Sequence, residues 1–151
     1  MGNALFYHLT RSRAEALLAQ LLPRALDAGW RVEVRAEGGG ERLAALDAAL
    51  WQPEGFLPHG LAGGPHDTRQ PVLLRSPDQP PAANGPACLM VLDGAAISTA
   101  EAGDMARICV IFDGSDPAAV DRARDQWRGL SEAGIAAEYW SEAGGRWERK
   151  R

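Results

Sequence analysis

The chain has 151 residues, of which 46% are hydrophobic and 24% are charged, a composition that fits one compact domain with its own core. The formal net charge of −4 argues against nonspecific nucleic-acid binding, because counterion release requires many clustered cations. No apolar run approaches the ~20 residues that span a bilayer, and the first residues lack the basic segment of a signal peptide. We therefore expect a cytoplasmic protein, in which Cys88 and Cys109 are buried, reduced thiols.

Strands are predicted at six short apolar or alternating runs: residues 4–9, 30–35, 71–74, 88–92, 108–112 and 135–140. Because helical patterns alternate with these runs, we predict an α/β fold. The fold is expected to be a single Rossmann-like domain over residues 1–143, with a mostly parallel sheet and helices on both faces. The basic residues 144–151 are expected to form a disordered tail, and the Pro- and Gly-rich residues 52–86 a long loop, ordered or in part mobile.

Four helices are predicted from their starting signals. The first follows Ser12, which has the spacing of a capping box with Glu15, and it carries a leucine stripe that Pro23 is expected to kink. The second follows the glycine turn at residues 38–40. A short third helix opens at the Ser98-Thr-Ala-Glu capping box. The fourth begins at Asp116-Pro117, an N-cap with proline at N1, and runs to about residue 132.

The sequence offers no convincing catalytic or cofactor site. The sequence disfavours a phosphate-binding loop, because the only lysine is Lys150 and the glycines at 38–40 lack the required spacing and fit an ordinary turn better. Asp93 and Asp113 each follow a strand at its carboxyl end, so a small Mg²⁺-dependent phosphoryl-transfer enzyme is the alternative hypothesis. No lysine or histidine accompanies these aspartates as a general acid. His59 and His66 are too few for a typical zinc site.

Two stretches have the character of binding surfaces. The first contains bulky apolar residues in and beside the Pro- and Gly-rich loop: Trp51, Phe56, Leu57 and Leu61. These side chains either fold over the sheet and complete the core, or form an exposed patch for a partner protein, since aromatic anchors dominate interface energetics.

The second surface is on the helix that begins at Asp116. At 100° per residue, one side of this helix carries three apolar residues, Val120, Ala123 and Leu130. Trp127 lies at the border of that side, and Arg124 and Arg128 lie just beyond it. An aromatic ring flanked by two guanidiniums can receive an apolar residue together with a carboxylate. The same spacing also fits a packed tryptophan between ordinary surface arginines.

At these stretches the chain resembles the chi subunit family of bacterial DNA polymerase III. The similar residues are the start at 3–7 and the segments 42–43, 47–51, 56–59, 61–63 and 71–72. The resemblance implies a Rossmann-like fold that binds no nucleotide, and a noncatalytic accessory subunit on the clamp-loader side of the replicase. It also implies two partners. One is the psi subunit, which links chi to the clamp loader. The other is the acidic C-terminal tail of single-stranded DNA-binding protein, which ends in phenylalanine.

Carried over by position, the resemblance assigns tail binding to Arg124, Trp127 and Arg128, and the psi or clamp-loader surface to the loop around Trp51 and Phe56. Trp127 stands where the family often has tyrosine, and Ser131 lies where relatives are more basic. The expected function is therefore an adaptor that contacts DNA only indirectly and uses no cofactor. A chi-like partner of a repair helicase is a further alternative, because the same aromatic surface can serve both roles.

Overall fold

The computed structural model describes residues 2–51 and 57–151. These residues form one eight-stranded sheet with the order β3-β4-β2-β5-β6-β1-β7-β8. Neighbouring strands are parallel except for β7 and β8. The strands are β1 (Asn3–Leu9), β2 (Val32–Ala36), β3 (Gly60–Leu61), β4 (Val72–Arg75), β5 (Cys88–Leu92), β6 (Arg107–Asp113), β7 (Ala136–Ser141) and β8 (Glu148–Arg149). All six predicted strands are thus present: 88–92 coincides with β5, and the ends of the other five differ by at most two residues.

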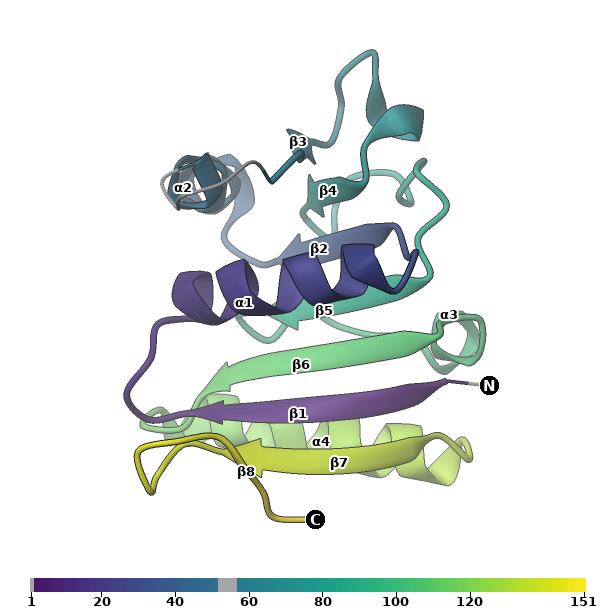
Figure 1. Ribbon diagram of the computed structural model, residues 1–151. Helices are drawn as coiled ribbons and strands as arrows, with labels where there is room; N and C mark the ends of the chain where they lie inside the picture. The colour runs from purple at the N-terminus through teal and green to yellow at the C-terminus, as the bar shows by residue number, and fades with distance from the viewer. Residues whose placement is uncertain (1, 52–56) are drawn as a thin grey trace.

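Helices cover both faces of the sheet, which confirms the predicted α/β class. They are α1 (Ala14–Asp27), α2 (Gly39–Trp51), α3 (Thr99–Gly103) and α4 (Pro117–Glu132), with a 3₁₀ turn η1 (Asp67–Arg69). In Figure 1, α1 crosses the near face and α4 lies behind β1 and β7. Each face has its own core: α1 and α2 pack on one, α3 and α4 on the other. None of the helices in the described ranges is long and apolar enough to cross a membrane.

The predicted leucine stripe of α1 is the buried face of that helix. Leu18 and Leu22 are fully buried, and α1 continues from Ala14 to Asp27 with Pro23 inside it. Gly29 follows with a φ of +85°, the left-handed conformation that ends a helix at little cost for glycine. Cys88 and Cys109 are buried and free, as expected.

The capping box predicted at the start of α1 is wrong. The N-cap is Arg13, whose side chain makes no cap hydrogen bond within the described residues. Ser12 instead binds Glu142, at 2.6 Å from its backbone N–H and 2.7 Å from its hydroxyl. Glu15 is held by Arg42, whose Nη1 is 2.5 Å from the carboxylate. Ser12 is thus bound by Glu142, which is distant in sequence, instead of by the nearby Glu15.

Glu142 anchors the turn between β1 and α1. Its Oε1 also accepts hydrogen bonds from the backbone N–H groups of Thr10 and Arg11, at 3.0 and 2.8 Å. Burial raises the pKa of Glu142, but the hydrogen bonds to Ser12, Arg11 and Thr10 outweigh it and lower the pKa to about 2. The carboxylate therefore stays ionised and fastens the end of β7 to the start of α1.

The C-terminal residues 144–151 also differ from the expected disordered tail. They turn back and place β8 antiparallel to β7, with Trp140 opposite Arg149 and Ser141 opposite Glu148. Trp147 packs edge-on against Tyr7, with ring centroids 5.4 Å apart. The segment looked basic and solvated in isolation, but β7 offers it an open edge and Tyr7 offers an apolar contact.

The expected long irregular loop is ordered where it is described. Residues 57–86 contain β3, η1 and β4, and residues 52–56 lie outside the described residues. The guanidinium of Arg75 donates to the carbonyl oxygens of Gln79 and Pro80, at 2.9 and 2.7 Å, and so holds the turn after β4.

A buried ion network lies beside this turn, between β2, β4 and α3. Glu33 Oε2 is 2.7 Å from Arg35 Nε and 2.8 Å from Arg75 Nη1. Arg35 also contacts Glu101 at 2.6 Å, and this hydrogen bond lowers the pKa of Glu101 to about 2. The Glu33 side chain is only 3% exposed. Its charge is therefore balanced inside the protein rather than by water.

Candidate functional site

A cavity of about 530 Å³ lies between α4, β7 and the C-terminal segment; we call it the α4 groove. Six aromatic or aliphatic side chains form its apolar lining: Phe6, Phe112, Val120, Ala123, Trp127 and Tyr139. Four cationic side chains line it as well: Arg124, Arg128, Lys150 and Arg151. The groove thus combines an apolar surface with positive charge, in a protein whose net charge is negative.

Local sequence signals position the helical side of the groove. The carboxylate of Asp116 accepts a hydrogen bond of 3.0 Å from the Ala118 N–H, and Pro117 occupies the first turn, as predicted. With the start of α4 fixed in this way, Arg124 and Arg128 are one helical turn apart on the same side. The structure therefore brings together all three predicted tail-binding residues, including Trp127, at one cavity.

Trp127 is both a packing residue and a lining residue, so the two interpretations of its position are compatible. Its ring meets Phe6 edge-on with centroids 5.2 Å apart, and it lies 6.3 Å from the ring of Tyr139. The Tyr139 hydroxyl is in turn hydrogen-bonded with Nδ1 of His8. Because β1, β7 and α4 hold these rings against one another, the apolar lining is preorganised.

The guanidinium groups of the two arginines on α4 are available to bind a negatively charged ligand. Arg124 lies 3.9 Å from Asp121, and Arg128 lies 3.7 Å from Asp125, both on the same helix. Each arginine side chain is 71% exposed. Exposed ion pairs at such distances are weak. A ligand carboxylate that approaches both guanidiniums can therefore replace Asp121 and Asp125 as their partner.

Sequence reasoning missed the strand side of the groove. Phe6 and Phe112 belong to β1 and β6, which are more than 100 residues apart in the sequence but paired in the sheet, with Phe6 opposite Val110. Lys150 and Arg151 belong to the segment that the sequence predicts to be a disordered tail. The available signal was Trp147, a large aromatic residue within the basic segment 146–151, which packs against Tyr7 of β1.

The second predicted surface is divided between core and solvent. Among the described residues, Trp51 and Leu61 are the exposed large hydrophobic side chains, at 54% and 42%. Leu57 is half-buried against the core under α1 and α2, and Phe56 lies outside the described residues. The Trp51 ring lies 4.2 Å from the ring of His59, which is itself 3.0 Å from the Asp47 carboxylate. His59 therefore supports an aromatic surface at the end of α2.

The aspartates of the Mg²⁺ hypothesis line another cavity, of about 500 Å³, at the carboxyl ends of the central strands. Arg42 binds Asp93 at 2.7 Å and thereby balances its charge. Asp113 accepts hydrogen bonds from the Ser115 hydroxyl and N–H, at 2.6 and 2.9 Å, which lower its pKa. No cluster of three or more potential metal ligands occurs in residues 2–51 and 57–151. The geometry fits an ion pair and a turn better than a metal centre.

The fold and its cavities define an α/β domain with a basic, aromatic groove and with both candidate metal-binding aspartates in structural contacts. The family model described as "DNA polymerase III chi subunit, HolC" matches residues 1–138. The chain therefore belongs to the chi subunit family of DNA polymerase III, whose members are accessory subunits in DNA replication. No curated protein matches the sequence.

Proposed function

We propose that the protein is a noncatalytic adaptor that links the DNA polymerase III clamp loader to single-stranded DNA-binding protein. The observation that carries this proposal is the α4 groove, in which cationic side chains surround an apolar lining. Its ligand is the acidic tail of single-stranded DNA-binding protein, which ends in phenylalanine. Such an adaptor acts in the cytoplasm and contacts DNA through this protein rather than directly.

The chemistry of the groove suits both parts of that ligand. Burying a phenylalanine side chain contributes about 1.5–3 kcal/mol, and Trp127 and Tyr139 offer an aromatic surface for it. A carboxylate beside Arg124 or Arg128 forms charge-assisted hydrogen bonds, which are about twice as strong as neutral ones. The net charge of −4 at the same time disfavours bare DNA as a competing ligand.

Calorimetric titration with a peptide of the tail tests this proposal. We expect saturable binding that weakens as salt is raised, because ion pairs at an exposed rim are screened. The same peptide without its terminal phenylalanine is expected not to bind, because the apolar lining then has no side chain to bury. A scrambled peptide of equal charge is the control. Absence of binding by the intact peptide at high concentration would reject the tail-binding role.

The exposed surface at Trp51, with Leu57 and Leu61, supports a second contact, to psi or an equivalent clamp-loader subunit. This surface is at the end of α2, whereas the α4 groove lies on the other face of the sheet (Figure 1). Both partners can therefore bind at once. The family's surface also includes the position of Phe56.

Trp51→Ala is expected to abolish or strongly weaken binding of the clamp-loader partner and to leave affinity for the tail peptide unchanged. The reason is that a large, half-exposed aromatic side chain is the typical anchor of an interface. Copurification with psi, or with the assembled clamp loader, measures the first effect, and calorimetry the second. A loss of folding would instead assign Trp51 to the core, and retention of the partner would remove it from the interface. A repair helicase that competes for the same surface would bind the wild type but not this variant.

A further inference from the structure

The two residues that follow β8 add positive charge to a second side of the α4 groove. Beyond β8 the chain continues along β7: the Lys150 N–H donates to the Tyr139 carbonyl at 2.6 Å, and the Tyr139 N–H donates to the Arg151 carbonyl at 3.2 Å. Tyr139 also lines the groove. The backbone of residues 150 and 151 is thus fixed directly beside the cavity that Arg124 and Arg128 line from α4.

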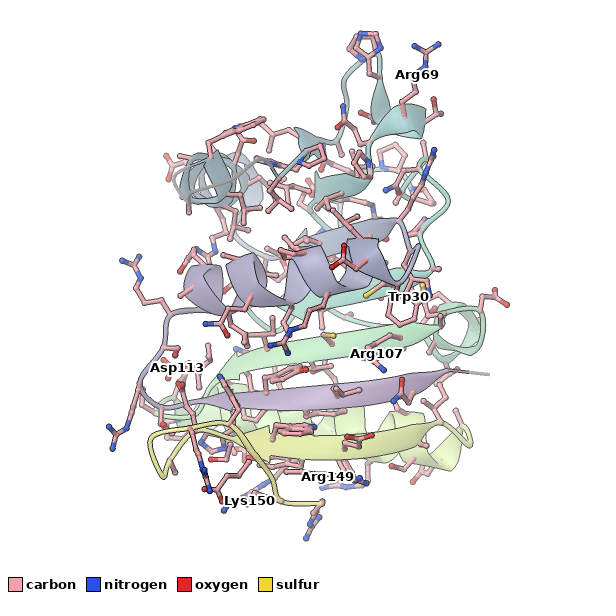
Figure 2. All side chains as sticks on the ribbon, viewed as in Figure 1. Trp30, Arg69, Arg107, Asp113, Arg149 and Lys150 are labelled. Carbon is pink, nitrogen blue, oxygen red and sulfur yellow. The ribbon has the colours of Figure 1, made fainter. Side chains whose placement is uncertain are left out.

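The cationic side chains of this segment lie in different surroundings. Arg149 is opposite Trp140 and lies 3.7 Å from Glu138, and neither Arg149 nor these two residues lines the groove. Lys150 and Arg151 do line it. Figure 2 labels Lys150 and Arg149 at this edge of the sheet. Of the cationic side chains in residues 144–151, therefore, Lys150 and Arg151 line the cavity and the others do not.

These residues lie beyond the range 1–138 that the family model matches, so family membership assigns them no role. We infer that Lys150 and Arg151 bind the acidic side chains of the tail peptide of single-stranded DNA-binding protein. The bound peptide then lies between these two residues and α4. The inference rests on the proposed function. Cations on both sides of an apolar cavity match a ligand that presents one apolar end group and several carboxylates. A single-stranded nucleic acid fits less well, since its bases would require an extended stacking platform.

The test compares three double variants in titrations with the acidic, phenylalanine-terminated peptide. Replacement of Lys150 and Arg151 by alanine is expected to weaken binding about 5- to 10-fold at low salt, as two rim charges are lost. It should also reduce the salt dependence. The matched control replaces Arg13 and Arg146, whose side chains are 87% and 85% exposed and which do not line the groove. This control is expected to stay within about twofold of wild type.

The third double variant, Arg124→Ala with Arg128→Ala, separates the two possible failures. If it weakens binding while the Lys150 and Arg151 variant matches the Arg13 and Arg146 control, the inference about Lys150 and Arg151 is wrong and the proposed function stands. If the wild type itself does not bind the peptide, the proposed function fails as well. Lys150→Arg should retain wild-type affinity. A single-stranded oligonucleotide that binds the wild type in place of the peptide would overturn the assignment of the ligand.

Discussion

Replacing Arg128 by alanine is expected to weaken binding of the tail peptide by about 1–3 kcal/mol, or roughly 5- to 150-fold, and Arg124→Ala to act in the same direction. Each substitution removes a guanidinium whose partner on α4 is 3.7 Å or more away and exposed. The lost charge-assisted bond to the peptide is therefore not compensated within the protein. Calorimetry at two salt concentrations measures both the affinity and its electrostatic part.

Arg122→Ala is the matched control for these substitutions. Arg122 belongs to the same helix and carries the same charge, but it lines the other cavities and not the α4 groove. Its replacement is expected to leave peptide affinity unchanged. The free energy of unfolding of all three variants should be within about 0.5 kcal/mol of the wild-type value, as is usual for substitutions at exposed positions. Equal weakening by Arg122→Ala and Arg128→Ala would indicate a general electrostatic effect and remove the groove from the mechanism.

Glu33→Ala is expected to lower the free energy of unfolding by about 3–5 kcal/mol. Glu33 is the shared partner of Arg35 and Arg75, whose side chains are 8% and 9% exposed. Its removal leaves these guanidiniums with fewer acceptors, and their desolvation cost is then uncompensated. Chemical denaturation followed by tryptophan fluorescence measures the change.

Glu37→Ala provides the comparison, since Glu37 follows β2 directly but is exposed. The Glu37→Ala substitution should change the free energy of unfolding by no more than about 0.5 kcal/mol. Below its unfolding transition, Glu33→Ala should retain peptide affinity, because the network is at β2 and β4, away from the strands that line the groove. A loss of less than 1 kcal/mol for Glu33→Ala would mean that water reaches the network and replaces the carboxylate.

Local signals were sufficient where a residue's partner is close in sequence. Asp116-Pro117 predicted the start of α4, and the Ser98 capping box is present, with Ser98 and Glu101 bonded reciprocally. The apolar runs 88–92 and 108–112 predicted buried strands correctly. The same reasoning failed at Ser12, because its N–H and hydroxyl both donate to the carboxylate of Glu142, which is distant in sequence, and Arg13 occupies the N-cap.

The sequence by itself determined the α/β class and the helix face that carries Arg124, Trp127 and Arg128, because helical spacing is fixed by the backbone. Its resemblance to a family also indicated the family to which the chain belongs. Only the tertiary structure decided that Phe6, Phe112 and Tyr139 complete an apolar cavity beside that face, because sheet order rather than sequence distance makes β1, β6 and β7 neighbours. It also placed Lys150 and Arg151 at the groove. An edge strand acquires its place from the strand it pairs with, and no pattern within residues 144–151 specifies that partner.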